Sequence, residues 1–224
     1  MASSRIAVGI DVGTYQVKVV VARQGNSPFP RVIGTGYAES KGLQHGYIVN
    51  VDDVTRSIKT AVAQAESTAG VRIKNAFLAV GGIGLDEVRG RGEAIIARAD
   101  AEVMDLDVEK AMEASRQNIA NRLLNRKILH TIPLVFTIDG AEGLGRPQGM
   151  KGTKLAVETL FITCLERHMT DLIEAVENTD IVVADMMAAP LAASLVSLTN
   201  AEKKAGCVLA NIGSETVAIV VFDN

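Results

Sequence analysis

The chain has little cysteine, no long uninterrupted apolar segment and no run of basic residues. Its two cysteines, Cys164 and Cys207, lie in apolar stretches without metal-ligand neighbours, so we expect buried free thiols in a reducing cytoplasm and no disulfide framework. The longest apolar run, 181–198, contains Asp185 and Pro190 and is not typical of a membrane span. A net charge of −3 without a basic patch disfavours non-specific binding of nucleic acid.

The short motifs of common enzyme classes are also missing. There is no Walker A loop, no Gly-x-Ser-x-Gly elbow and no pair of catalytic carboxylates. The glycines at 81–84 lack the dinucleotide-binding spacing, and we interpret them as a domain-boundary hinge. The three histidines, His45, His130 and His168, have no cysteine or acidic partner at ligand spacing, which favours surface or hydrogen-bonded core positions over catalysis.

The pattern of apolar residues predicts an α/β fold that opens in the order β-β-β-α-β. The helix at 52–69 has the clearest signal, because apolar residues recur on one face, acidic residues occupy the first turn and Gly70 follows as the stop. Outside the segment 83–163, we expect strands at 5–10, 16–23, 31–37, 75–80, 181–184, 206–212 and 216–222, and helices at 52–69, 167–178 and 191–198.

Residues 83–163 have a different character and could fold as an inserted unit. We expect a strand at 87–96, a helix at 107–123 and strands at 127–139 and 153–163, the last two separated by a glycine-rich loop. Strand-helix-strand-strand is a compact α+β arrangement, which suits an inserted domain.

The sharpest chemical signal is the turn between the first two strands, Asp11-Val12-Gly13-Thr14-Tyr15-Gln16-Val17-Lys18. A carboxylate at a strand end, here Asp11, can hold a magnesium-bound water, and a glycine turn lets backbone N–H groups approach a phosphate. The Thr14 hydroxyl adds a donor and Lys18 adds a positive charge. An ordinary structural hairpin, in which Gly13 only supplies a positive φ angle, is an equally open alternative.

A second turn near the end of the chain repeats this design. It reads Asn211-Ile212-Gly213-Ser214-Glu215-Thr216 between two apolar strands. Two such hairpins facing each other could clamp a triphosphate from both sides. The ordinary-hairpin alternative is stronger here, because Asn211 cannot supply a charge to a metal ion.

Several longer segments point to a known family. They read GYIV at 46–49, ESTAGVRI at 66–73, KILHTIP at 127–133, IDG at 138–140 and PQGMKG at 147–152. With the two hairpins and the insert, these segments resemble FtsA, the actin-like bacterial cell-division protein, along almost the whole chain. The segments around His130 and Gly149 are more specific to that family than either phosphate turn, which actin, Hsp70 and sugar kinases share.

The resemblance implies an actin-like (ribonuclease H-like) α/β lobe with an inserted subdomain. Residues 1–82 and 164–203 correspond to subdomain 1A, residues 83–163 to the SHS2-like subdomain 1C, and residues 204–224 to only the first hairpin of subdomain 2A. In this family ATP with Mg²⁺ sits between two lobes, and the protein tethers the ring protein FtsZ to the membrane. Subdomain 1C serves there for self-association and for contacts with other division proteins.

For the site, the resemblance implies two sets of nucleotide-binding residues. Asp11, Gly13, Thr14, Tyr15, Gln16 and Lys18 would face the β- and γ-phosphates and the magnesium ion, with Asp11 holding Mg²⁺ through a water. Asn211, Gly213, Ser214, Glu215 and Thr216 would lie across from them. The implied location is the cytoplasm, peripheral to the inner face of the cell membrane at the division site.

The sequence departs from the family pattern in three respects. The usual second turn is Asp-Ile-Gly-Gly-Gly-Thr, so Asn211 removes a carboxylate that would orient metal-bound water, and Glu215 would place negative charge near the γ-phosphate. The chain also stops at Asn224, before the adenosine-binding turn, FtsZ-docking region and membrane-anchoring helix of the family. Finally, 216–222 would be an unpaired apolar edge. We therefore expect a scaffold that is not an enzyme, with weak or absent hydrolysis and little stabilisation by MgATP.

Two other classes share parts of this pattern. A sugar-kinase phosphotransferase would need an aspartate general base facing a sugar, and no residue stands out for that role. A pilus-assembly actin homologue shares the fold, but we do not expect it to carry this insert with His130 and 147–152.

Overall fold

The computed structural model describes residues 5–27, 29–143 and 145–223, and its chain divides into two compact units. The first unit contains residues 1–85 and 165–224, and the second contains residues 86–164. The sequence placed the start of the insert at residue 83, whereas the second unit of the structure starts at Asp86. The closing hairpin, which we assigned to a separate lobe, is grouped with the first unit and contacts its helix α4 (Ala189–Ser197).

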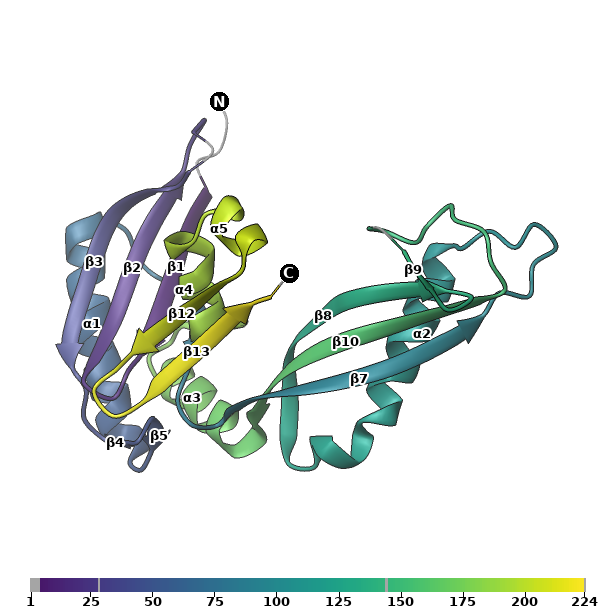
Figure 1. The fold of residues 1–224 in the computed structure, drawn as a ribbon. Helices are drawn as coiled ribbons and strands as arrows, with labels where there is room; N and C mark the ends of the chain where they lie inside the picture. Colours follow the sequence, from purple (N-terminus) through teal and green to yellow (C-terminus); the bar gives the residue numbers. More distant parts are fainter. Residues whose placement is uncertain (1–4, 28, 144, 224) are drawn as a thin grey trace. The chain divides into compact units, whose positions relative to one another are not determined.

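The first unit is built on a five-stranded sheet with the order β11-β6-β1-β2-β3. Strands β1, β2 and β3 form an antiparallel meander, and β6 and β11 run parallel to β1. Figure 1 shows the meander in purple with helix α1 behind it. The strands are β1 Arg5–Val12, β2 Gln16–Gln24, β3 Arg31–Glu39, β6 Asn75–Val80 and β11 Val182–Ala188.

One face of this sheet carries the core of the first unit. Helix α1 (Val51–Ala69) packs on β2, on β3 and on helix α3 (Glu166–Glu177). The predicted helix at 52–69 is confirmed: the Asn50 side chain caps it by accepting from the Asp53 N–H at 3.2 Å, and Gly70 ends it with a φ of 66°. The buried side chains are mostly aliphatic: Val8, Ile10, Val17, Val19, Val21, Val54, Ile58, Ala61, Leu78, Leu172 and Val176.

The remaining elements of the first unit are short. They are strands β4 (Leu43–Gln44) and β5 (Tyr47–Ile48), helices α4 and α5 (Asn200–Ala205), and the antiparallel hairpin of β12 (Cys207–Ile212) and β13 (Val217–Phe222). The sequence did not predict β4, β5 or α5. Cys164 is buried as expected, but Cys207 on β12 is partly exposed, so the expectation for that thiol is wrong.

The second unit has the predicted strand-helix-strand-strand order around a sheet of β7, β10, β8 and the short β9. Its elements are β7 Leu85–Ile95, α2 Asp105–Asn118, the 3₁₀ helix η1 Ala120–Leu123, β8 Arg126–Ile138, β9 Ala141–Glu142 and β10 Lys154–Leu165. Two apolar clusters form its core, one around Leu155 and Ala111 and one around Phe161 and Ile119. The helix predicted at 107–123 therefore starts earlier and changes to a 3₁₀ turn after Asn118.

Asp107 organises the start of helix α2. Its buried carboxylate accepts from the Met104 N–H at 2.9 Å and pairs with the Arg98 guanidinium. The hydrogen bond from Arg98, then that from the backbone, holds the pKa of Asp107 below its usual value.

Within the described residues, no helix is long and apolar enough to cross a membrane.

Candidate anion-binding site

The two glycine turns have the same backbone geometry. In the first, the Gly13 N–H donates to the Gln16 carbonyl at 3.3 Å; in the second, the Gly213 N–H donates to the Thr216 carbonyl at 2.8 Å. A Cβ atom added at either glycine would lie 3.1 Å from that same carbonyl oxygen, which is tighter than most real contacts. Neither glycine has a positive φ, so the alternative in which Gly13 only supplies that angle is wrong. The sequence repeat is therefore a structural repeat.

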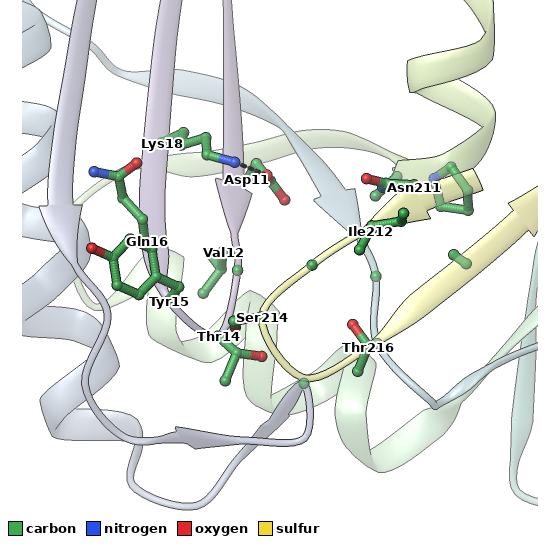
Figure 2. A pocket seen from close by; sticks show the side chains of 18 residues that line it. Asp11, Val12, Thr14, Tyr15, Gln16, Lys18, Asn211, Ile212, Ser214 and Thr216 are labelled. Atoms are coloured by element: carbon green, nitrogen blue, oxygen red, sulfur yellow. Dashed lines mark ion pairs between the residues drawn. The ribbon is translucent and has the colours of Figure 1, made fainter. Parts of the chain in front are cut away.

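Both turns open onto one cavity of about 310 Å³ in the first unit. Figure 2 shows the side chains that the turns contribute to it. Ten of the eleven residues predicted for the nucleotide site line this cavity, and they are Asp11, Gly13, Thr14, Tyr15, Gln16, Lys18, Asn211, Gly213, Ser214 and Thr216.

The N–H groups of Thr14 and Ser214, which follow the two glycines, have no hydrogen-bond partner among the described residues. Unpaired backbone N–H groups beside a cavity attract anions, because a phosphate oxygen replaces the water that otherwise satisfies them. The turns therefore present matched donors from opposite ends of the chain.

Asp11 and Lys18 provide the charges of the first turn. They are cross-strand partners in the β1–β2 register, and the Lys18 Nζ lies 3.7 Å from a carboxylate oxygen of Asp11 (Figure 2). Burial raises the pKa of Asp11 above its usual value, against the opposing effect of Lys18. A partly desolvated carboxylate beside one lysine still has capacity for a further cation.

Glu215 is the predicted site residue that does not line the cavity. Its carboxylate accepts from the His45 backbone N–H at 2.5 Å and lies 3.7 Å from the His45 Nδ1. This contact holds the carboxylate on the β4–β5 connection, so Glu215 itself does not line the cavity, and its effect on a γ-phosphate stays a prediction. Asn211, by contrast, lines the cavity at the position that corresponds to Asp11 in the first turn.

Sequence reasoning missed the start of helix α4. Ala189 and Pro190 line the cavity, and no side chain caps this helix. A helix N-terminus carries unpaired N–H groups and a partial positive charge, so it favours anions. We expected the helix to begin at 191, but proline is well accommodated in the first turn, and Pro190 was the signal that could have placed the start correctly.

Three further glycines line the cavity: Gly46, Gly81 and Gly82. We interpreted the last two only as a boundary hinge. They directly follow β6, the strand beside β1, so the ends of two adjacent parallel strands bring them next to the first turn. Their position after a buried strand was the signal in the sequence.

The donor set suits a metal ion that arrives with phosphate rather than one held by protein alone. Among the described residues there is no group of three or more histidine, cysteine, aspartate or glutamate side chains that could hold a metal. Magnesium in phosphate sites commonly keeps several waters and takes one or two carboxylates, so Asp11 alone fits that mode of binding.

The second unit matches a known family model. Residues 88–163 match the model described as the SHS2 domain inserted in FtsA. This range falls within residues 86–164, which the structure separates as the second unit.

The whole chain is similar to curated cell division proteins named FtsA. It is 31% identical to that of Pseudomonas aeruginosa over 98% of this chain and 52% of the relative, and 33% identical to that of Enterococcus hirae over 100% and 50%. The Escherichia coli protein is 27% identical over 97% of this chain and 51% of the relative. The resemblance predicted from the sequence is confirmed, and the chain spans about half the length of the curated relatives it matches.

Solved structures confirm the actin-like α/β fold. The PilM–PilN type IV pilus biogenesis complex aligns with a TM-score of 0.69 at 16% identity, over 96% of this chain and 57% of that chain. The ethanolamine utilization protein EutJ of Carboxydothermus hydrogenoformans aligns with a TM-score of 0.50 at 12% identity, over 98% and 47%. The alignment with the pilus protein covers 96% of this chain and so includes the insert, which means that an insert at this position does not by itself distinguish an FtsA-like chain from a pilus-assembly homologue, as we had expected it to. The sequence similarity to FtsA is what distinguishes them.

Proposed function

We propose, from the similarity of the whole chain to FtsA, that it acts as an FtsA-like scaffold of bacterial cell division. Its first unit would bind the phosphates of a nucleotide, and its SHS2 unit would serve for self-association and protein contacts. The observation that carries the proposal is the pair of matched glycine turns on one cavity, in an actin-like unit interrupted by an SHS2 unit.

The proposed ligand of the cavity is ATP with Mg²⁺. The N–H groups of the two turns and of the α4 N-terminus would donate to phosphate oxygens, and Lys18 would add positive charge. Asp11 would hold Mg²⁺ through a bound water, and that ion would supply charge neutralisation on the phosphates. The contacts proposed here are all to the phosphates and the metal ion, so we propose weak affinity from these contacts alone, with a Kd on the order of 1 mM.

We propose a binding role rather than catalysis for this cavity. Asn211 occupies the place where a carboxylate would match Asp11, and an amide does not accept a proton from an attacking water. Hydrolysis of ATP should therefore be weak or absent. Because Glu215 does not line the cavity, we attribute the weak hydrolysis to Asn211 rather than to repulsion of the phosphate by Glu215.

The second unit has a surface that suits self-association. Met104, Leu106 and Met150 are 50%, 54% and 40% exposed, and the Val103 N–H donates to the Met150 carbonyl at 2.9 Å, which keeps the two methionine segments together. Exposed apolar side chains that gather in this way commonly mark protein contacts. The proposed partners are further copies, an FtsZ-type ring protein and other division proteins at the inner face of the membrane.

The scaffold part of the proposal is tested by the assembly of the purified chain. Sedimentation velocity over a range of concentrations should show reversible assembly, and a charge-reversing Leu106→Glu variant should reduce it. Leu124→Glu, at another exposed leucine of the same unit, is the matched control. A chain that stays monomeric at all concentrations would contradict the scaffold role.

Nucleotide binding is measured separately, by nuclear magnetic resonance titration with millimolar MgATP. We expect saturable shifts of the cavity residues, weakened in Lys18→Gln and unchanged in Lys59→Gln, which alters an exposed lysine on α1. Shifts that are absent, or equally weakened in both variants, would contradict phosphate binding at this cavity.

A further inference from the structure

His168 on helix α3 is a buried histidine beneath the cavity. It is 3% exposed, and its Nε2 lies 3.0 Å from the Gly81 carbonyl oxygen. Since a carbonyl can only accept, the Nε2 carries the proton and donates. The Nδ1 is buried without a hydrogen-bond partner in the described residues. Burial lowers the pKa of His168, against the smaller opposing effects of Gly81 and Asp171, so the ring is neutral near pH 7.

The hydrogen bond from His168 fixes the direction of the next backbone donor. The peptide between Gly81 and Gly82 is trans, as are all described peptides, so its C=O and N–H bonds point in opposite directions. With the carbonyl turned to the buried ring, the Gly82 N–H points away from the ring. Gly82 lines the cavity, and no described residue accepts from this N–H.

The surroundings hold both the ring and the glycine in place. The Tyr47 ring meets the His168 ring edge to face, with centroids 5.4 Å apart and an interplanar angle of 84°. Gly46, the residue before Tyr47, packs directly on Gly82: a Cβ added at Gly46 would lie 2.7 Å from the Gly82 Cα. Both glycines have positive φ angles, 78° and 86°, which other residues adopt only with strain.

We propose that the Gly82 N–H is a third donor to the bound anion, beside those of the two turns, and that His168 is the positioning residue that orients it. The inference rests on the proposed phosphate binding and deepens it by naming the class of ligand group. A neutral backbone donor beside glycine turns and an uncapped helix N-terminus fits a polyphosphate oxygen. His168 acts by holding the Gly81 carbonyl and does not itself contact the ligand.

The experiment uses the full chain and inorganic tripolyphosphate, which needs no adenine site. The ¹⁵N–¹H signal of Gly82 is followed during titration in wild type, His168→Leu and His168→Gln. The leucine fills the space without donating, whereas the glutamine Nε2 can replace the histidine donor. We expect a saturable Gly82 shift in wild type, about tenfold weaker affinity in His168→Leu, and affinity within about threefold of wild type in His168→Gln.

Leu172→Ala is the matched control, because Leu172 is buried on the same helix and does not line the cavity. It should lower the melting temperature and leave the affinity unchanged. If His168→Leu binds as wild type does, or if Leu172→Ala weakens binding equally, the positioning role is wrong and phosphate binding stands. If wild type shows no binding, the anion site and this inference both fail.

Discussion

The two glycine turns share a backbone geometry but differ in charge and in support. The first carries Asp11 and Lys18 on strands of a five-stranded sheet, and its neighbours Val17 and Val19 are fully buried. The second carries the neutral Asn211 on a two-stranded hairpin. The backbone donors are thus repeated while the charges are not, so the two turns can share phosphate binding, but of Asp11 and Asn211 only Asp11 can give a metal ion a negative charge.

The hairpins also differ in what covers them. On the second hairpin the register pairs Val208 with Val221 and Ile212 with Val217, and all four are at least 60% exposed. An exposed apolar pair gains little from the hydrophobic effect, whereas the buried valines of β2 each contribute roughly 1.5–3 kcal/mol. Burial of the β2 valines in the core therefore stabilises the strands that carry the first turn, whereas the second hairpin adds little to the stability of the unit.

The largest expected effect tests this difference in support. Ile10→Ala on β1, at 1% exposure, should lower the free energy of unfolding by about 2–5 kcal/mol, because it leaves a cavity in the core. Ile219→Ala on β13, at 63% exposure, should change it by less than about 0.5 kcal/mol. Urea unfolding followed by circular dichroism gives both values, and equal losses would contradict the comparison.

The second prediction concerns the missing charge. Asn211→Asp would give the second turn the carboxylate that the first already has, so phosphate release from MgATP should rise by roughly tenfold or more over wild type. Asn211→Ser, which adds no charge, is the control and should leave the rate at the wild-type level. An unchanged rate in the aspartate variant would show that the absent carboxylate is not what limits hydrolysis.

The third prediction is a pH dependence from His168. Its folded pKa lies below the value of 6.5 expected when unfolded, so the unfolded state binds more protons as the pH falls through and below 6.5. The free energy of unfolding should therefore decline with acidification from about pH 6.5 down to the lowered folded pKa. Urea unfolding between pH 7.5 and 5 measures this, and His168→Gln should flatten that part of the profile. An equally steep profile in the variant would assign the effect to other groups.

The smallest expected effect concerns Glu215. Glu215→Gln weakens the hydrogen bond from the His45 N–H and should cost at most about 1 kcal/mol, with no gain in tripolyphosphate affinity, because the carboxylate lies outside the cavity. Glu177→Gln, an exposed glutamate on α3, controls for the change in net charge. A selective rise in affinity for Glu215→Gln would support the expectation that this carboxylate repels phosphate.

The sequence was sufficient where local pattern and backbone conformation decide the outcome. The α1 helix follows from its apolar face and from Gly70, and both hairpins follow from apolar strands around a glycine. The repeat of the turns was visible in the sequence because both turns need a glycine at the same place. In each, the carbonyl of Gln16 or Thr216 lies so close to the glycine that a Cβ atom would crowd it.

The sequence was insufficient where distant segments meet. Gly46, Gly82 and Pro190 reach the cavity only because separate elements converge on the end of β1. The direction of Glu215 depends on a backbone donor at His45, 170 residues away. The role of His168 likewise depends on a carbonyl 87 residues away, so its spacing to other ligands in the sequence carried no signal.

The central claim is that the two turns act on one anion, and the Thr14 and Ser214 amide signals test it most directly. During titration of the wild-type chain with tripolyphosphate, both signals should shift with the same Kd, since both residues line one cavity. Shifts at Thr14 alone, or two clearly different dissociation constants, would contradict a shared site.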